Sequence, residues 1–383
     1  MSILGQSTAQ SLGRSGHQGG IDTGNINPLF VDEYASEVDK TIVKESFMRK
    51  YVTMKSIRGT DTLTNHRMGG AQLQKVTRGV RPVDHSPTFD NISIKVDTMI
   101  LARTATALID DFISSLDVRM EVGAEHGKEI GIFTDQAFLV QGIKAAQVTV
   151  VVPVKDPATD AVIGSAEKGG WADRIVSGSG APTGPAKTIT RSAPIGFKGA
   201  TTVQLGEVGD ENDPVALELA IQDMCQGIEE KDVSLDGAVI LLRPAQYYTL
   251  LKNDKLISSE FSTGNGDYAK GVVLKSNGVR IEKTNRFPKH SDVGKTHYLS
   301  NAGNNNAYDV TRVDANCVCV LIMPKALLAG EAIPLTSDVH YNKTELQWFV
   351  DSYLSFAVTP NRAEMAGAIF RADLTSTTEF GNS

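Results

Sequence analysis

Few residues of this sequence have the types and spacing that catalysis or metal binding requires. His126 and Glu129 stand three positions apart, and Cys317 and Cys319 alternate along a predicted strand. A zinc site takes three or four such ligands, and the other histidines are scattered, so neither pair is sufficient. Gly184–Thr188 superficially resembles a phosphate loop, but it has no adjacent Gly-Lys and its proline removes an amide. We therefore expect no metal ion, no cofactor and no catalytic residue.

The composition is that of an ordinary globular protein. With 383 residues, 41% hydrophobic and 22% charged, the chain is long enough for two or three lobes with separate cores. The net charge of −7 argues against a general nucleic-acid binder but permits a local basic patch. Cys225 is the third of three cysteines, and so few thiols predict buried free cysteines in a reducing cytoplasm.

The sequence gives no sign of a membrane or secretion segment. The longest apolar runs, Val148–Pro153 and Cys317–Met323, are far shorter than the ~20 residues that cross a bilayer. The first residues lack the pattern of a signal peptide. We expect a protein that is made and folded in a cytoplasm and has no membrane partner.

The elements that must position any functional residue change in type along the chain. Residues 1–26 are polar and glycine-rich, so we expect them to be mobile unless a neighbouring molecule captures them. Asn27-Pro28 predicts a helix start, followed by an apolar stripe to Phe47. From 51 to 106 a two-residue alternation with many glycines and prolines predicts a long hairpin with a poorly buried tip. An isolated hairpin of this length is marginal in water, so it must lie on something.

The hairpin is basic, and a later segment is acidic. Residues 49–81 contain eight basic residues and one acid, whereas residues 207–236 contain ten acids and only Lys231. Complementary patches on one chain favour head-to-tail contacts between copies, which close into rings. Two solvated faces explain the pattern equally well. DNA binding by the hairpin is the weaker hypothesis, because the segment lacks the series of aromatic residues between basic ones that stacking on single strands needs.

A helix of about thirty residues is predicted over 117–146, on a stripe that includes Val118, Phe133 and Val140. Glycines at 123, 127 and 131 form one smooth strip along it. Each costs about 1 kcal/mol relative to alanine, so close approach of another backbone is the favoured compensation. The alternative is a locally loosened or bent helix.

The second half of the sequence predicts a mixed sheet covered by helices. Residues 153–199 are expected to be rich in loops. A helix is predicted from Asp213-Pro214, a buried strand at Ala238–Leu242, and a helix after Arg243-Pro244. The strand Cys317–Met323 is expected to end at Pro324, before a short helix over 326–328, and further strands at 338–356 and 366–370 complete the chain.

Three segments carry a resemblance to a known family. They are the run LIDDFISSLDVRME at 108–121, the step Arg243-Pro244 to Leu250, and Gly271-Val272 through Phe287-Pro288. With these segments the chain resembles the major capsid proteins of tailed bacteriophages, and among them those of short-tailed phages of the autographivirus group. In that family the acidic turn Asp110-Asp111 leads into the "spine" helix. The resemblance covers about residues 28–370 in the order of elements.

The resemblance implies an α+β fold, the Hong Kong 97-type capsid fold. It assigns an N-terminal arm to 1–50, an extended loop to 51–106, a peripheral lobe with the spine helix (117–146) to 107–212, and an axial lobe to 213–333. It further assigns residues 334–375 to strands that return to the peripheral lobe, and 376–383 to a tail. It also implies hexamers and pentamers of this chain in an icosahedral shell, in a virion assembled in the host cytoplasm. The shell would enclose double-stranded DNA without reading its sequence, which suits a net acidic subunit. Scaffold and portal proteins are further expected partners, and a decoration protein is an open one.

On this hypothesis the functional residues are contacts between subunits. We expect them among the hairpin residues Arg58, Arg67, Lys75, Arg78 and Arg81, the helix glycines Gly123, Gly127 and Gly131, and the acidic residues Glu211, Glu218 and Glu229. Two other functions stay open from the sequence. One is a bacterial nanocompartment (encapsulin-like) shell with an enzyme cargo, and the other is a soluble α/β enzyme or binding module.

Overall fold

A computed structural model describes most of the chain, and the described residues form two compact units. The first unit contains the described parts of 97–134 and 332–356, and the second those of 47–96, 135–331 and 357–383. The described residues are 47–70, 73, 75–79, 81–82, 84, 89–108, 118–156, 161–180, 189–194, 196–253, 266–267, 272–273 and 275–380. The helix predicted after Asn27-Pro28 and the run 109–117 lie outside them.

The second unit is built around a seven-stranded mixed sheet with the strand order β13-β14-β10-β15-β18-β9-β7. In chain order the strands are β7 (Ile175–Ser177), β9 (Thr201–Leu205), β10 (Val239–Leu242), β13 (Lys275–Ser276), β14 (Val279–Lys283), β15 (Cys317–Ile322) and β18 (Ala366–Phe370). Strand β15 is antiparallel to β10 and β18, whereas β9 and β18 are parallel. The central strands are buried along their whole length, as a sheet covered on both faces requires.

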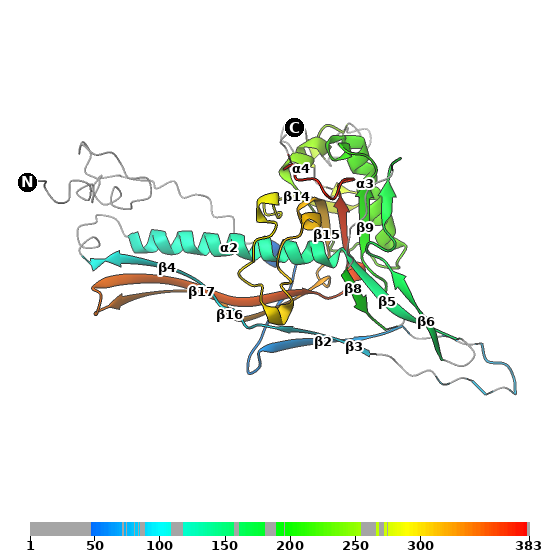
Figure 1. The fold of residues 1–383 in the computed structure, drawn as a ribbon, viewed down its shortest axis with the longest axis horizontal. Coiled ribbons are helices and arrows are strands. Elements are labelled where there is room, and N and C mark those ends of the chain that lie inside the picture. The colour runs from blue at the N-terminus through cyan, green and yellow to red at the C-terminus, as the bar shows by residue number, and fades with distance from the viewer. Residues whose placement is uncertain are drawn as a thin grey trace, which may run out of the picture. The chain divides into compact units, whose positions relative to one another are not determined.

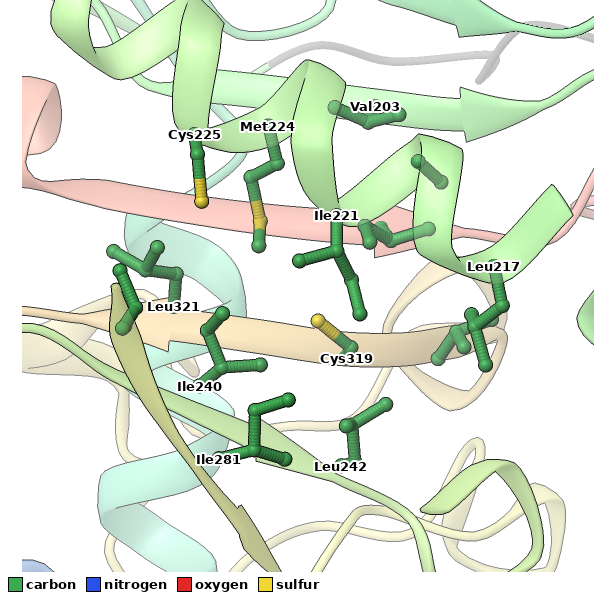
Figure 2. Close-up of a cluster of buried hydrophobic side chains, with 14 of the residues drawn as sticks. Val203, Leu217, Ile221, Met224, Cys225, Ile240, Leu242, Ile281, Cys319 and Leu321 are labelled. Carbon is green, nitrogen blue, oxygen red and sulfur yellow. The ribbon is translucent and has the colours of Figure 1, made fainter. Parts of the chain in front are cut away.

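Helix α3 (Pro214–Glu229) covers one face of this sheet. It begins where the sequence predicts, because the Asp213 side chain accepts a hydrogen bond from the Val215 amide and Pro214 fits the first turn. Its buried side chains recur at helical spacing and point toward the sheet. Figure 2 shows Leu217, Ile221, Met224 and Cys225 facing Ile240, Leu242, Ile281, Cys319 and Leu321.

The C-terminal half of helix α2 (Val118–Ala145) covers the other face (Figure 1). A side chain at Gly142 would meet Cδ1 of Ile322 at 2.7 Å and Cγ1 of Val320 at 3.8 Å, so the missing Cβ lets the helix approach β15. Successive strand residues point to opposite faces, and Leu321 belongs to the α3 side. The sheet is therefore sandwiched between α2 and α3.

A three-stranded sheet, ordered β6-β5-β8, adjoins these elements in the second unit. Its strands are β5 (Val148–Lys155), β6 (Val162–Lys168) and β8 (Ile189–Ser192). The stretch 153–199, expected to be rich in loops, also contains strands that the sequence did not predict, because β6 shows no alternation yet pairs with β5 along its length. Gly199 permits the tight connection, since a Cβ there would lie 2.0 Å from the Lys168 carbonyl oxygen.

In the first unit, strand β4 (Ile100–Ala107) pairs antiparallel with the first part of β17 (Gln347–Pro360). Arg103 lies opposite Asp351 and donates to both carboxylate oxygens, at 2.7 and 2.6 Å. The pKa of Asp351 is lowered, first by this hydrogen bonding. His126 of α2 bonds to the Thr104 hydroxyl at 2.7 Å, so the helix is held to the strand. Strand β4 thus belongs with β17 rather than with the hairpin in which we expected it.

The remaining strands include the hairpin and one long strand. They are β1 (Met54–Ser56), β2 (Thr62–Met68), β3 (Phe89–Lys95), β11 (Gly266–Asp267), β12 (Val272–Val273) and β16 (Leu327–Asn342). A four-stranded sheet has the order β1-β16-β17-β4. Strand β16 occupies the place of the short helix predicted at 326–328. That prediction is wrong, because the chain is extended from Leu327 onward and pairs parallel with β1 from Ala329 to Glu331.

Short helices complete the description. They are η3 (Met48–Lys50), η4 (Asp210–Asn212), α4 (Pro244–Leu250), η5 (His290–Asp292), η6 (Ala302–Asn304), α6 (Arg312–Ala315) and η7 (Ala363–Met365). Helix α4 follows Arg243 as predicted. The buried Arg243 guanidinium donates to the carbonyl oxygens of Cys317, Ala315 and Pro288.

The C-terminal segment folds back onto this side of the sheet. The Phe380 ring lies 4.2 Å from the guanidinium carbon of Arg243 and 3.6 Å from that of Arg371. Arg371 also donates to the Thr378 carbonyl oxygen, and the Asn316 amide donates to that of Leu374. Cation–π contacts and hydrogen bonds therefore fasten the segment to two arginines.

The seven-stranded sheet joins segments that the resemblance assigns to different lobes, and the lobe boundaries stay predictions. Strands β9 and β18, expected in the peripheral lobe, lie in the same sheet as β10, β14 and β15, expected in the axial lobe. The connection is the antiparallel pairing of β18 with β15, and β9 joins the sheet by pairing parallel with β18.

Candidate intersubunit surface

The hairpin predicted from the alternation is formed by β2 and β3, which pair from Thr62 opposite Lys95 to Met68 opposite Phe89. One face of this ribbon is buried. Ile92, Ile94 and Val96 pack with Ile57, Leu328 and Ala357, so the hairpin rests on the first residues of β16 and the last part of β17. The expectation that a long hairpin must lie on another part of the molecule is met within the same unit.

Arg67, expected at a subunit contact, is buried on this inner face. Its guanidinium pairs with Asp90, donates to the Asn361 carbonyl oxygen at 2.7 Å, and stacks over the Phe197 ring. Only 3% of its side chain is exposed. Arg67 therefore fastens the hairpin to its own chain, because the alternation of β2 turns it inward next to Asp90 of β3. We remove it from the set of intersubunit candidates.

The other four basic candidates lie on the surface. Arg58, Lys75, Arg78 and Arg81 are all exposed. Arg81 forms an ion pair with Asp84 at 3.2 Å, and both side chains are 87% exposed, so the pair contributes little to stability. Their contact with another copy stays a prediction.

The same end of the hairpin exposes apolar side chains that our sequence analysis missed. Met68 and Phe89, 61% and 67% exposed, are cross-strand neighbours on the outer face, and Leu73 and Val76 are 97% and 67% exposed. The outer positions Thr64 and His66 are polar, so the apolar Met68 breaks the pattern; that break was the available signal. We name Met68, Leu73, Val76 and Phe89, with Lys75, Arg78 and Arg81, the hairpin end.

The acidic candidates have three different environments. Glu211 is buried and paired with Arg371 at 3.0 Å, so its charge is used within the chain. Glu218 accepts from the Asn253 side-chain amide at 2.5 Å and is partly buried. Glu229 is exposed. A count of acids along the sequence therefore overstates the acidic surface.

The helix glycines that can be assessed face open space within the chain. A Cβ at Gly127 or Gly131 would have no heavy atom of the described residues within 4 Å, so no described backbone approaches them closely. The expected compensation is thus not found inside the described chain. Gly123 lies in α2, and nothing is described around it. Close approach of another copy to this strip stays a prediction.

The remaining titratable groups of interest are possible metal ligands and the three cysteines. Among the described residues, no three His, Cys, Asp or Glu side chains are grouped so as to hold a metal ion. All three cysteines are free and buried, and burial raises the pKa of the Cys225 thiol to about 11 and those of Cys317 and Cys319 further. Such thiols are poor nucleophiles. Within the described part of the chain, no helix has the length and apolar character to cross a membrane.

Comparison with known proteins identifies the relatives of this fold. Residues 179–329 match the Gp10A-like family, described as major capsid protein. The mature capsid of bacteriophage PhiM1 is 25% identical, with a TM-score of 0.65 over 89% of this chain and 91% of that one. The capsid of cyanophage P-SCSP1u is 18% identical, with a TM-score of 0.67 over 94% and 98%. No curated protein matches the sequence.

These matches confirm the resemblance to phage major capsid proteins that the sequence predicts. They also confirm the predicted α+β fold of the Hong Kong 97 type. They do not favour a nanocompartment shell or a soluble enzyme. The lobe assignments and the individual contact residues stay predictions.

Proposed function

We propose that this chain is the major capsid protein of a tailed, short-tailed bacteriophage and assembles as hexamers and pentamers into an icosahedral shell around double-stranded DNA. The proposal includes a scaffold protein during assembly in the host cytoplasm, a portal at one vertex, and a structural role without catalysis. The observation that carries it is the match to the PhiM1 mature capsid over about nine-tenths of both chains.

The hairpin provides the mechanism, because its two ends have opposite properties. Its base is fixed by Arg67 and by the cluster around Ile92. Its end exposes four apolar and three basic side chains. An apolar centre rimmed by charges is the usual composition of a protein–protein contact. A rigid base with such an end can reach a neighbouring copy while the subunit stays folded.

Charge reversal at the hairpin end tests this function. We expect Arg78→Glu with Arg81→Glu, coexpressed with a scaffold protein, to yield folded subunits and few or no shells by negative-stain electron microscopy. The physical reason is that both side chains are exposed and make no contact on which folding depends. Particle yield equal to that of the unchanged chain would contradict a role for these two residues.

The matched control is Arg78→Lys with Arg81→Lys, which keeps both charges and should assemble. Circular dichroism and size-exclusion chromatography of each variant separate failure to fold from failure to assemble. If the unchanged chain itself forms only monomers or dimers with scaffold present, the capsid function is wrong.

A further inference from the structure

The outer face of α3 carries an apolar strip. Val215 and Leu219 lie one helical turn apart and are 57% and 44% exposed. Val208, in the loop that leads to η4 and α3, is 82% exposed. Large apolar side chains grouped on a surface and rimmed by polar residues mark an interaction site.

Carboxylates occur before this strip and farther along the same helix. Glu207 adjoins Val208, Asp223 follows Leu219 by one turn, and Glu229 and Glu230 lie at the end of the helix. Some acids of the segment act within the chain, as Glu211 does with Arg371. The rest leave an apolar strip with carboxylates along the same segment, which we name the α3 face.

The opposite side of the same unit carries an exposed aromatic ring in a segment with more basic than acidic residues. Tyr298 is 79% exposed, and its neighbours in sequence point inward: His297 stacks on Tyr308, and Leu299 is 4% exposed. Residues 283–312 contain five basic residues (Lys283, Arg286, Lys289, Lys295 and Arg312) and two acids (Asp292 and Asp309). Lys283 is exposed but packs over the rings of Tyr247 and Tyr248. The other exposed basic residues are Lys289, Lys295, which lies 3.8 Å from Asp292, and Arg312. We name Tyr298 with these three basic residues the Tyr298 face.

The two faces lie on opposite sides of the seven-stranded sheet. The Gln141 and Lys144 side chains of α2 donate to the Ala307 carbonyl oxygen at 3.0 and 2.6 Å, and Lys144 also donates to that of Asp309 at 2.6 Å. These bonds hold the segment around Tyr298 on the α2 side, where Figure 1 shows the yellow loop crossing α2. Helix α3 covers the other side, so one copy cannot bring its two faces together.

We infer that the α3 face of one subunit docks against the Tyr298 face of the next copy, head to tail. The inference rests on the proposed function and adds to it a contact distinct from the hairpin. Opposite charges and two apolar centres make the faces complementary. Contact between two α3 faces would instead set carboxylates against carboxylates. A contact that joins two different faces repeats from copy to copy and closes into a ring.

Cysteine crosslinking in assembled particles tests the contact. The chain carrying both Val215→Cys and Tyr298→Cys is assembled with a scaffold protein, treated with a flexible bis-maleimide, and run on a denaturing gel. We expect a ladder of covalent oligomers up to six chains, at least tenfold more intense than from either single variant. The native cysteines leave the background low, because they are buried and their pKa values are raised.

The controls are the two single cysteine variants and the unchanged chain. The inference is overturned if particles form and the double variant gives no more ladder than the single ones. It is also overturned if Val215→Cys alone crosslinks to dimers, since two α3 faces would then meet. Absence of particles from the unchanged chain would overturn the proposed function, and the inference with it. Leu219→Glu gives an independent check, with particle yield expected to fall at least fivefold and the circular dichroism spectrum unchanged.

Discussion

In the seven-stranded sheet Leu321 is fully buried, whereas Leu73 at the hairpin end is 97% exposed. The arginines differ in the same way: Arg243 donates to three carbonyl oxygens of its own chain, and Arg78 lies in solvent. Leucine and arginine occur in both regions, but these side chains are buried against their own chain in the sheet region and exposed at the hairpin end. The sheet region satisfies its side chains internally and determines the fold, while the hairpin end leaves them available to another molecule.

The largest expected effect is on the free energy of unfolding, and it comes from comparing a leucine of the sheet with a leucine of the hairpin end. Leu321→Ala should lower the free energy of unfolding by about 2–5 kcal/mol, because it removes buried methyl groups and leaves a cavity. Leu73→Ala should leave the unfolding midpoint unchanged and lower the particle yield. Urea denaturation of the unassembled subunit measures both. An equal loss of stability from the two variants would contradict the distinction between the buried sheet and the exposed hairpin end.

A pH series tests whether His297, the residue before Tyr298, is buried in the folded subunit. Burial lowers the pKa of His297 to about 4. Lys144 also lowers this pKa, whereas Asp309 and Asp292 raise it. Between pH 4 and 6.5 the unfolded chain therefore binds more protons at this residue than the folded chain, so stability falls as the pH is lowered. We expect a loss on the order of 1–2 kcal/mol from pH 7 to pH 5, after allowance for partial exposure.

The control for this series is His297→Gln, which removes the titration. Other groups titrate in the same range, so the informative quantity is the difference between the two proteins in unfolding free energy at pH 7 and at pH 5. If the variant shows the same pH dependence as the unchanged chain, His297 is not the group responsible.

The smallest effect concerns glycines. Gly127→Ala should stabilise the isolated subunit by about 0.5–1 kcal/mol, because alanine favours a helix and a Cβ there meets no atom of the described residues. Particle yield should fall if another copy approaches the strip. Gly199→Ala is the matched control from the closed region, where a Cβ would lie 2.0 Å from a carbonyl oxygen, and it should destabilise the subunit. Normal assembly of Gly127→Ala would exclude the strip from the contacts.

The sequence predicted those elements whose patterns are local. Helix α3 was predictable from Asp213-Pro214 and its apolar spacing, and α2 from its length and stripe. Strand β16 was not, because its first residues are extended by pairing with β1, more than 270 positions earlier in the chain. The role of Arg67 was hidden for a similar reason: Asn361 and Phe197, its partners, are distant in sequence. Local charge counts identified the hairpin end but could not separate its exposed arginines from the buried one.

The Phe380 ring between Arg243 and Arg371 has a consequence for proteolysis. A cut after residue 373 leaves all seven strands of the sheet intact but removes the ring that covers the two guanidinium groups and the Thr378 carbonyl oxygen that accepts from Arg371. The remaining subunit would keep its secondary structure while the edge near α4 opens to solvent. Resistance of the C-terminal segment to trimming is therefore a gauge of whether this side of the sheet is closed.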